Sequence, residues 1–189
     1  MRLSLSSPQK RLLLSLAIIL AGIGIDQLTK FLAVVYLKGN PSLPIWQDVL
    51  HLTYVENRGA AFGMLAEHRW VFLVFSSVAI VGLLVYLAIG KNISTLSAVS
   101  ISMIVSGGIG NMIDRLFRSG VDALGKVYYY VVDFIDFTLI DFAVFNGADS
   151  FVCVGAGLMI LSLALEYKEE WKKEKAADAA KETETEEKE

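Results

Sequence analysis

Four long runs of apolar residues, each with at most one charged residue, dominate the chain. They extend over residues 12–29, 70–90, 92–113 and 142–165. A membrane-spanning helix needs about 20 consecutive, mostly apolar residues, and a water-soluble domain of this length rarely carries several such runs. The pattern therefore predicts four transmembrane helices, and these leave little chain for anything else.

The polar segment over about 38–68 predicts a small strand-rich cap at one end of the helices. Branched and aromatic residues from Val49 to Val55 favour a β-strand. The following Asn57, Arg58 and Gly59 are typical of a turn. A second segment over about 115–141 contains an apolar, aromatic stretch at 127–137, which is too short to span a bilayer. We expect that stretch to lie at the membrane interface, where tyrosines suit the headgroup level.

Composition and charge restrict the function further. Hydrophobic residues make up 54% of the chain, and the formal net charge is −3. Residues 166–189 contain six lysines and ten acids, a net charge of −4, so the rest of the chain carries +1. The acidity therefore belongs to a tail, which we expect to begin as a fraying helix end and continue as a charged, disordered extension. No basic stripe suggests nucleic acid as a partner.

The basic residues at the two ends predict the topology. Arg2, Lys10 and Arg11 precede the first apolar run, and four lysines follow the last one closely. Positive charge marks the cytoplasmic side, so both termini are predicted to be cytoplasmic and the two polar loops to lie outside. No cleavage site of small residues follows the first run at the right distance, which predicts an uncleaved first helix.

A single cysteine, Cys153, lies inside an apolar run. It cannot form an internal disulfide, and no CxxC motif or Cys/His pair is present to hold a metal. The sequence therefore predicts neither a metal nor a cofactor.

Ionisable and amide residues at membrane depth are the candidate functional residues, because such groups are costly in lipid and usually face an interior site. Asp26 and Lys30 are four residues apart on one helix face, so they could form a local ion pair or support a site. Asn111 and Asp114 end the third run and precede Arg115. That cluster could be a helix-end Asp–Arg pair, or it could orient a catalytic group.

Further acids lie near the start of the last run. Asn146 could cap a helix with Asp149 in its first turn, although capping alone would leave a buried carboxylate without a named partner. Asp133 and Asp136 could simply face water. Paired carboxylates held close together share a proton, and such a pair can hydrolyse a peptide bond. Chemistry alone does not select the pair, and the candidates are Asp114, Asp133, Asp136, Asp141 and Asp149.

Five sequence blocks in order resemble lipoprotein signal peptidase, also called signal peptidase II. They are Asp26-Gln-Leu-Thr-Lys30, Asn57-Arg-Gly-Ala-Ala-Phe-Gly63, Gly107-Gly-Ile-Gly-Asn-Met-Ile-Asp-Arg115, Val131-Val-Asp-Phe134 and Phe145-Asn-Gly-Ala-Asp149. The resemblance covers about residues 12–165. It implies an all-α membrane protein with four transmembrane helices, a small extracytoplasmic β-cradle and a short interfacial segment. The chain would divide into a four-helix transmembrane peptidase domain, 1–167, and the charged tail, 168–189.

The resemblance also implies an activity and its residues. The activity would be that of an aspartyl endopeptidase of the bacterial inner membrane that cuts diacylglyceryl-modified prolipoproteins just before the lipid-bearing cysteine. Asp133 and Asp149 would be the catalytic pair. The residues expected to support the site or hold substrate are Asp26, Lys30, Asn57, Arg58, Asn111, Asp114, Arg115 and Asn146. We expect a monomer in contact with membrane lipid, with its active site near the outer face and no metal or cofactor.

Two departures from the family's spacing keep one alternative open. The stretch between Asp114 and Asp133 is longer than usual, with an apparent insertion around 120–130, and the stretch between Asp133 and Asp149 is slightly short. Asp136 could therefore take the place of Asp133. Two other classes of protein also remain: a small transporter or proton-relay protein that uses the same acids, and a structural or assembly protein of the membrane.

Overall fold

The computed structural model of the protein describes residues 8–59 and 69–186, with side chains as far as residue 177. Its helices are α1 (Pro8–Tyr36), α2 (Arg69–Ile89), α3 (Thr95–Phe117) and α4 (Gly147–Glu186). All four are long and apolar enough to cross a membrane. The predicted four-span architecture is confirmed, and the part of the second sequence block from residue 60 to 63 lies outside the described residues.

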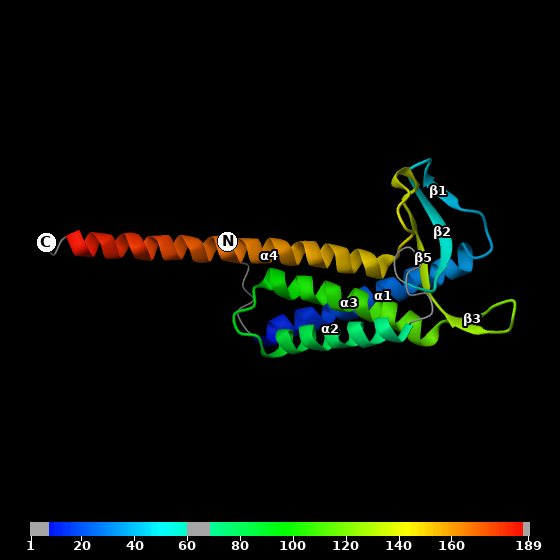
Figure 1. The fold of residues 1–189 in the computed structure, drawn as a ribbon, viewed down its shortest axis with the longest axis horizontal. Helices are drawn as coiled ribbons and strands as arrows, with labels where there is room; N and C mark the ends of the chain where they lie inside the picture. Colours follow the sequence, from blue (N-terminus) through cyan, green and yellow to red (C-terminus); the bar gives the residue numbers. More distant parts are fainter. Residues whose placement is uncertain (1–7, 60–68, 187–189) are drawn as a thin grey trace.

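The helices form a bundle in which α3 is central and contacts α1, α2 and α4 (Figure 1). Glycines allow the closest approaches. A side chain at Gly107 would collide with the backbone oxygen of Ala148, and one at Gly110 would collide with the Asp26 carboxylate. Small residues let membrane helices pack closely, and here they bring the start of α4 and the middle of α1 against α3.

Two of the apolar runs begin a few residues before their helices do, and local hydrogen bonds explain both helix starts. α3 begins at Thr95 because the Ser94 hydroxyl accepts a hydrogen bond from the Ser97 backbone N–H, as N-cap residues do. α4 begins at Gly147, not near residue 142, because Phe145 is bonded by its backbone to Ile135. Of the apolar residues just before Asn146, only Phe145 is bridged to β5, and Asn146 caps the helix as one of the two predicted alternatives has it.

A sheet of three antiparallel strands stands across one end of the bundle (Figure 1). Its strands are β1 (Leu43–Trp46), β2 (Leu50–Asn57) and β5 (Val131–Asp136), and β2 is the central one. The register pairs Val55 with Asp133 and His51 with Asp136. The predicted cap of strands is confirmed, and a short 3₁₀ helix, η2 (Thr138–Ile140), follows β5.

The stretch 127–137, which is predicted to lie at the membrane interface without a fixed conformation, forms two strands. β4 (Val127–Tyr129) pairs with β3 (Ser119–Val121) in a hairpin, and β5 joins the larger sheet. These β-branched and aromatic residues favour strands. Pairing with a neighbouring strand satisfies their backbone N–H and C=O groups, whereas in an isolated interfacial segment those groups would have to bond to water. The hairpin accounts for the extra residues around 120–130.

The charged end of α4 also differs from prediction. The helix continues to Glu186, where we expected disorder. Alanine, glutamate and lysine are strong helix formers, so the segment can extend the helix beyond the membrane. The domain boundary after residue 167 stays a prediction.

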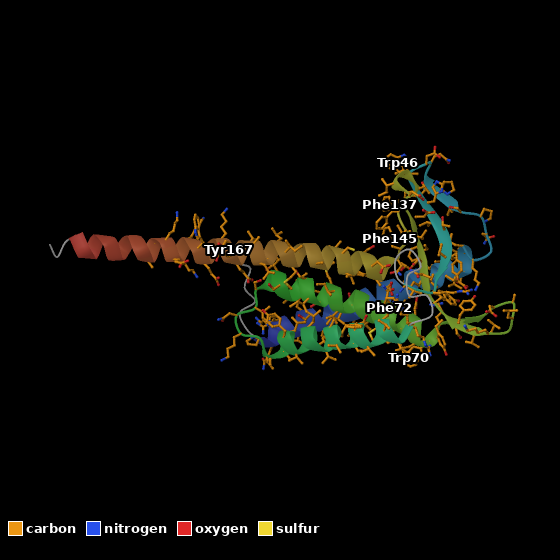
Figure 2. The ribbon with its side chains drawn as sticks, viewed as in Figure 1. Trp46, Trp70, Phe72, Phe137, Phe145 and Tyr167 are labelled. Atoms are coloured by element: carbon orange, nitrogen blue, oxygen red, sulfur yellow. The ribbon has the colours of Figure 1, made fainter. Side chains whose placement is uncertain are left out.

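Large apolar side chains cover the outside of the bundle, as expected of a surface that faces lipid (Figure 2). Phe75 is 72% exposed and Val78 is 69% exposed on α2, and Leu13 is 66% exposed on α1. The labelled Trp70 and Phe72 lie at the end that carries the sheet, whereas Tyr167 lies toward the other end. Aromatic side chains near both ends suit the two membrane interfaces.

Candidate active site

Asp133 is buried where β5 meets the end of the helix bundle. The side chain is enclosed, because the residue is only 2% exposed. The Asn57 amide donates to Asp133 Oδ2 at 2.8 Å, and the Asn146 amide donates to Oδ1 at 2.6 Å. Burial raises the pKa of Asp133 to about 6, the amide of Asn57 opposes this, and the nearby charge of Asp149 adds to it. Asp133 therefore does not simply face water, which was one of the open alternatives.

Asp149 lies in the first turn of α4 and closes a reciprocal cap with Asn146. The Asp149 N–H donates to Asn146 Oδ1, and the Asn146 N–H donates to Asp149 Oδ2, both at 3.1 Å. This is the hydrogen-bond pattern of a capping box. The other carboxylate oxygen, Oδ1, accepts from the Asn111 amide at 2.8 Å. The same carboxylate therefore caps α4 and accepts a hydrogen bond from a side chain of α3.

Two asparagines connect the carboxylates of Asp133 and Asp149. Asn146 donates from Nδ2 to Asn111 Oδ1 at 3.1 Å as well as to Asp133. Asn111 in turn donates to Asp149. A continuous chain of amides thus joins the two acids, and three elements, β5, α3 and α4, contribute to it.

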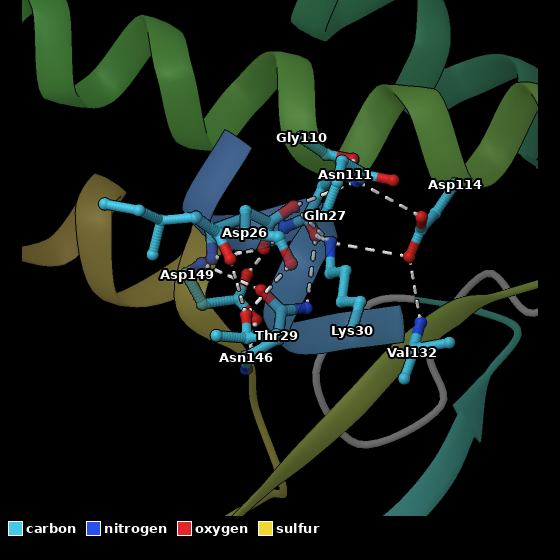
Figure 3. A network of polar contacts seen from close by, with 12 residues as sticks. Asp26, Gln27, Thr29, Lys30, Gly110, Asn111, Asp114, Val132, Asn146 and Asp149 are labelled. Atoms are coloured by element: carbon cyan, nitrogen blue, oxygen red, sulfur yellow. Dashed lines mark hydrogen bonds and ion pairs between the residues drawn. The ribbon is translucent and has the colours of Figure 1, made fainter. Parts of the chain in front are cut away.

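A buried ionic cluster lies directly behind these amides (Figure 3). Lys30 is fully buried, with its Nζ 2.9 Å from Asp26, 3.4 Å from Asp114 and 2.9 Å from Asn111 Oδ1. Asp26 also accepts from the Ala148 backbone N–H at 2.8 Å. Asp114 accepts from the Val132 N–H at 3.1 Å. The cluster therefore ties α1 and α3 to the two segments that carry Asp133 and Asp149.

Arg115 lies beside the site but does not form the predicted pair with Asp114. Asp114 pairs instead with Lys30 and with Arg118, whose Nε lies 3.4 Å away. Arg115 donates to the backbone oxygens of Gly59 and Asn111, at 3.2 and 3.4 Å. It thereby links α3 to the end of β2, and its charge lies close enough to influence Asp149 and Asp133.

Arg58 contacts the hairpin of β3 and β4. Its side chain is exposed and lies 3.4 Å above the ring of Tyr128 in the hairpin. Nearby, Glu56 accepts from Lys38, Tyr54 and Tyr128 at 2.8, 3.1 and 2.6 Å. The larger sheet and the hairpin are held together by these contacts.

The two remaining candidate acids lie apart from the amide chain. Asp136 accepts a hydrogen bond from the Thr53 hydroxyl at 2.7 Å and sits opposite His51 on β2. Asp141 is exposed and ends η2 in a left-handed conformation, with φ of 50°. Across residues 8–59 and 69–186, no three His, Cys, Asp or Glu side chains come together in a way that could hold a metal ion.

Sequence reasoning did not single out Gln27, although it stands inside the first motif. Its amide donates to the Gly110 backbone oxygen at 3.1 Å and to the carboxylates of Asp26 and Asp114 at 3.1 and 3.4 Å. A polar residue next to Asp26 in an apolar helix was the available signal. The cluster around Glu56 was also missed, because it joins residues far apart in the sequence.

Four helices able to cross a membrane, with a sheet at one end and two linked carboxylates at their junction, define the class as a membrane-embedded protein with a buried polar site. A family model described as signal peptidase (SPase) II matches residues 18–165. A lipoprotein signal peptidase of Halothermothrix orenii is 42% identical over 163 residues, 85% of this chain and 97% of that protein. One of Brevibacillus brevis is 39% identical over 147 residues, 77% of this chain and 91% of that protein.

A solved structure described as a bacterial membrane enzyme is similar in three dimensions. It has a TM-score of 0.69 at 29% identity and covers 81% of this chain and 88% of its own. The chain belongs to the signal peptidase II family. The predicted family is therefore confirmed. The protein is a protease, and its four apolar helices fit a multi-pass protein of the bacterial membrane. The comparisons do not favour the transporter alternative.

Proposed function

We propose that the protein is an aspartyl endopeptidase in which Asp133 and Asp149 are the catalytic pair. The observation that carries the proposal is the amide chain through Asn111 and Asn146, which joins these two carboxylates. Asp136 bonds to Thr53 and has a separate environment. Like-charged carboxylates that interact this closely share a proton, and one member keeps it more readily.

The two acids take different roles in this mechanism. Asp149 lies at the start of α4, where the helix dipole stabilises negative charge, and it acts as the base. It removes a proton from water, and the water oxygen forms a bond to the peptide carbonyl carbon. Asp133, whose pKa is raised by burial, donates its proton to the carbonyl oxygen. The C–N bond then breaks as Asp149 passes the proton that it took from water to the leaving nitrogen, and Asp133 takes its proton back from a hydroxyl of the diol intermediate as the carbonyl re-forms.

The supporting residues have distinct tasks. Asn57 and Asn146 hold the Asp133 carboxyl from both of its oxygens. Lys30 and Asn146 both donate to Asn111 Oδ1, so Asn111 directs its N–H groups toward Asp149. Arg115 supplies positive charge next to both acids. Lys30 and Asp26 reach the reacting atoms only through other residues, so we regard them as positioning residues.

The substrate is a prolipoprotein, as the names of the similar proteins indicate. We propose that its cysteine already carries diacylglycerol and that cleavage falls just before that cysteine. The site lies where the helix bundle meets the sheet (Figure 1), so the acyl chains of a bound substrate can remain in lipid while the peptide crosses the carboxylates.

The orientation in the membrane and the oligomeric state are also proposals. Lys10, Arg11 and Lys91 lie at the end of the bundle away from the sheet, and the basic residues of α4 extend past that same end (Figure 1). Positive charge is retained on the cytoplasmic side. Both termini are therefore assigned to the cytoplasm and the catalytic pair to the outer face. We propose that the enzyme works as a monomer in contact with membrane lipid.

Cleavage by the purified protein tests the proposal. Diacylglyceryl-modified and unmodified precursors are incubated in detergent with a chelator, using wild type, Asp133→Asn, Asp149→Asn and the matched control Asp136→Asn. We expect cleavage of the modified precursor only, abolished by the first two variants and retained by the third. If Asp136→Asn abolishes cleavage and Asp133→Asn does not, the pair is misassigned. Loss of wild-type activity in chelator would replace the aspartyl mechanism with a metal-dependent one.

A further inference from the structure

A cavity of about 400 Å³ lies at the end of the bundle opposite the sheet. The start of α1, the end of α2 and the turn between α2 and α3 form its walls. Pro8 and Arg11 come from α1, and Gly90, Lys91 and Asn92 come from the turn. The catalytic carboxylates lie at the other end of the bundle, so the cavity is separate from the proposed active site (Figure 1).

The cavity has a positive wall. Arg11 and Lys91 both line it, and none of its seven described lining residues is acidic. Arg11 uses Nη2 to donate to the Gly90 backbone oxygen at 3.2 Å. Its Nε is shielded from solvent and has no hydrogen-bond partner among the described residues. A guanidinium carries five N–H donors, so the bond to Gly90 leaves others for an added anion.

The turn that carries Lys91 is fixed by its own backbone. Gly90 donates its N–H to the Tyr86 oxygen at 2.8 Å. A side chain at Gly90 would approach that same oxygen and the side chain of Ile93 too closely. Asn92 adopts a left-handed conformation with φ of 57°, which asparagine tolerates better than most residues. The wall formed by the turn is therefore preformed.

Exposed apolar surface borders the cavity on both sides. Leu12 and Leu13 follow Arg11 on α1, and Ile89, which is 75% exposed, ends α2. An anion bound between the cations would thus sit at the boundary of a lipid-facing surface. Basic pockets between membrane helices bind anionic lipid headgroups, and the acyl chains of such a lipid could lie along these leucines and Ile89.

We propose that this cavity binds the phosphate group of an anionic phospholipid, with Arg11 and Lys91 as its ligands. The guanidinium and the ammonium group supply charge-assisted donors to the phosphate oxygens. The apolar flanks select a lipid over free phosphate. The site does not depend on the assignment of the catalytic pair.

Lipid retention by the full-length protein tests the proposal. Purified protein in detergent is mixed with matched amounts of dioleoyl phosphatidylglycerol or dioleoyl phosphatidylcholine, and bound lipid is counted by native mass spectrometry. Arg11→Gln and Lys91→Gln are compared with Lys168→Gln, which removes an exposed cation of α4 outside the cavity. Arg11→Lys tests whether charge at that position restores binding. A melting curve for each variant establishes that it is folded.

We expect wild type to retain phosphatidylglycerol in preference to phosphatidylcholine. Arg11→Gln and Lys91→Gln should each weaken that preference about fivefold, since each basic residue contributes on that order near an anionic lipid. Lys168→Gln should leave it unchanged, and Arg11→Lys should restore most of it. Equal retention of the two lipids, or equal losses in all three glutamine variants, would overturn the proposal. Displacement of the lipid by 10-fold molar excess of inorganic phosphate would show a free-phosphate site instead.

Discussion

The ammonium group of Lys30 lies 2.9 Å from the side-chain oxygen of Asn111, and this contact determines which way the Asn111 amide faces. Because Lys30 can only donate, it requires the oxygen of the amide, and the amide nitrogen is then directed at Asp149. A lysine of α1 thus influences a carboxylate of α4 without touching it.

Removing the Lys30 ammonium should strongly destabilise the protein. Asp26 and Asp114 would remain buried without their cation, and breaking a buried ion pair from one side costs about 3–5 kcal/mol. Lys38→Met is the matched control, since Lys38 is half exposed in its pair with Glu56 and such pairs contribute about 0–1 kcal/mol. Thermal unfolding in detergent measures both. Equal losses of stability in Lys30→Met and Lys38→Met would show that the buried cluster around Lys30 stabilises the protein no more than an exposed ion pair does.

Asn111→Ala should lower kcat by about 100-fold while the protein stays folded, because a catalytic group that loses its positioning contact is misaligned. Ser102→Ala on the same helix is the control, since the Ser102 hydroxyl bonds only to the Ala98 oxygen of its own helix. Initial rates at saturating precursor give kcat for both. A normal kcat in Asn111→Ala would remove Asn111 from the positioning of Asp149.

Stability should depend on pH through Asp133. Its folded-state pKa of about 6 lies above the ordinary value of 3.8, so the folded state binds the proton more tightly than the unfolded one. The associated stability is present below about pH 4 and is lost as pH rises through 6, a difference of about 3 kcal/mol. Asp133→Asn cannot lose that proton, so its stability relative to wild type should improve by roughly this amount between pH 4 and pH 8.

Unfolding curves at several pH values measure this difference between Asp133→Asn and wild type. Part of the shift comes from the charge of Asp149, so in Asp149→Asn the pH-dependent step should move to lower pH. A flat difference across this pH range would contradict the raised pKa of Asp133, and an unchanged step in Asp149→Asn would contradict the coupling of the two acids.

Gly107→Ala should destabilise the bundle by about 1–3 kcal/mol, because the added methyl group would meet the backbone oxygen of Ala148, which cannot move aside easily. Gly157→Ala is the control. A methyl group at Gly157 would have no neighbour within 4 Å, and alanine favours a helix, so this variant should be neutral or slightly more stable. Melting temperatures in detergent distinguish the two, and the reverse order would argue against close packing of α3 and α4.

Tyr128→Phe should loosen the hairpin of β3 and β4 from the larger sheet. The hydroxyl that it removes donates to Glu56 at 2.6 Å. Together with the hydrogen bonds from Lys38 and Tyr54, this bond lowers the pKa of Glu56 against the opposing effect of burial. Amide hydrogen exchange over residues 119–129 should become faster, while exchange in α3 should not change. Tyr129→Phe is the control, since Tyr129 contacts Arg69 through its ring, and an equal effect there would contradict a specific link through Glu56.

The sequence predicts the helices well, because each span carries its own apolar signal. It predicts the sheet only in part, since β5 becomes a strand by pairing with β2 about 80 residues earlier. For the site, charge at membrane depth identifies Asp26, Lys30 and Asp114 as residues that need buried partners. The spacing of Asp26 and Lys30 also predicts their ion pair, which is confirmed. It does not identify partners across helices, so Asp114 pairs with Lys30 and Arg118, where a pair with Arg115 was one of two open alternatives. Those partners depend on how the helices pack, which no single segment encodes.

The reciprocal cap between Asn146 and Asp149 links the folding of α4 to the assembly of the site. The two hydrogen bonds that begin α4 also orient the Asp149 carboxylate, and Asn146 holds Asp133 as well. Because α4 follows α1, α2 and α3 along the chain, the proposed catalytic pair is complete only when the first turn of α4 has formed against α3. A partly inserted chain has no assembled pair, so peptide bonds in the surrounding membrane are exposed to this chemistry only after the enzyme has finished folding.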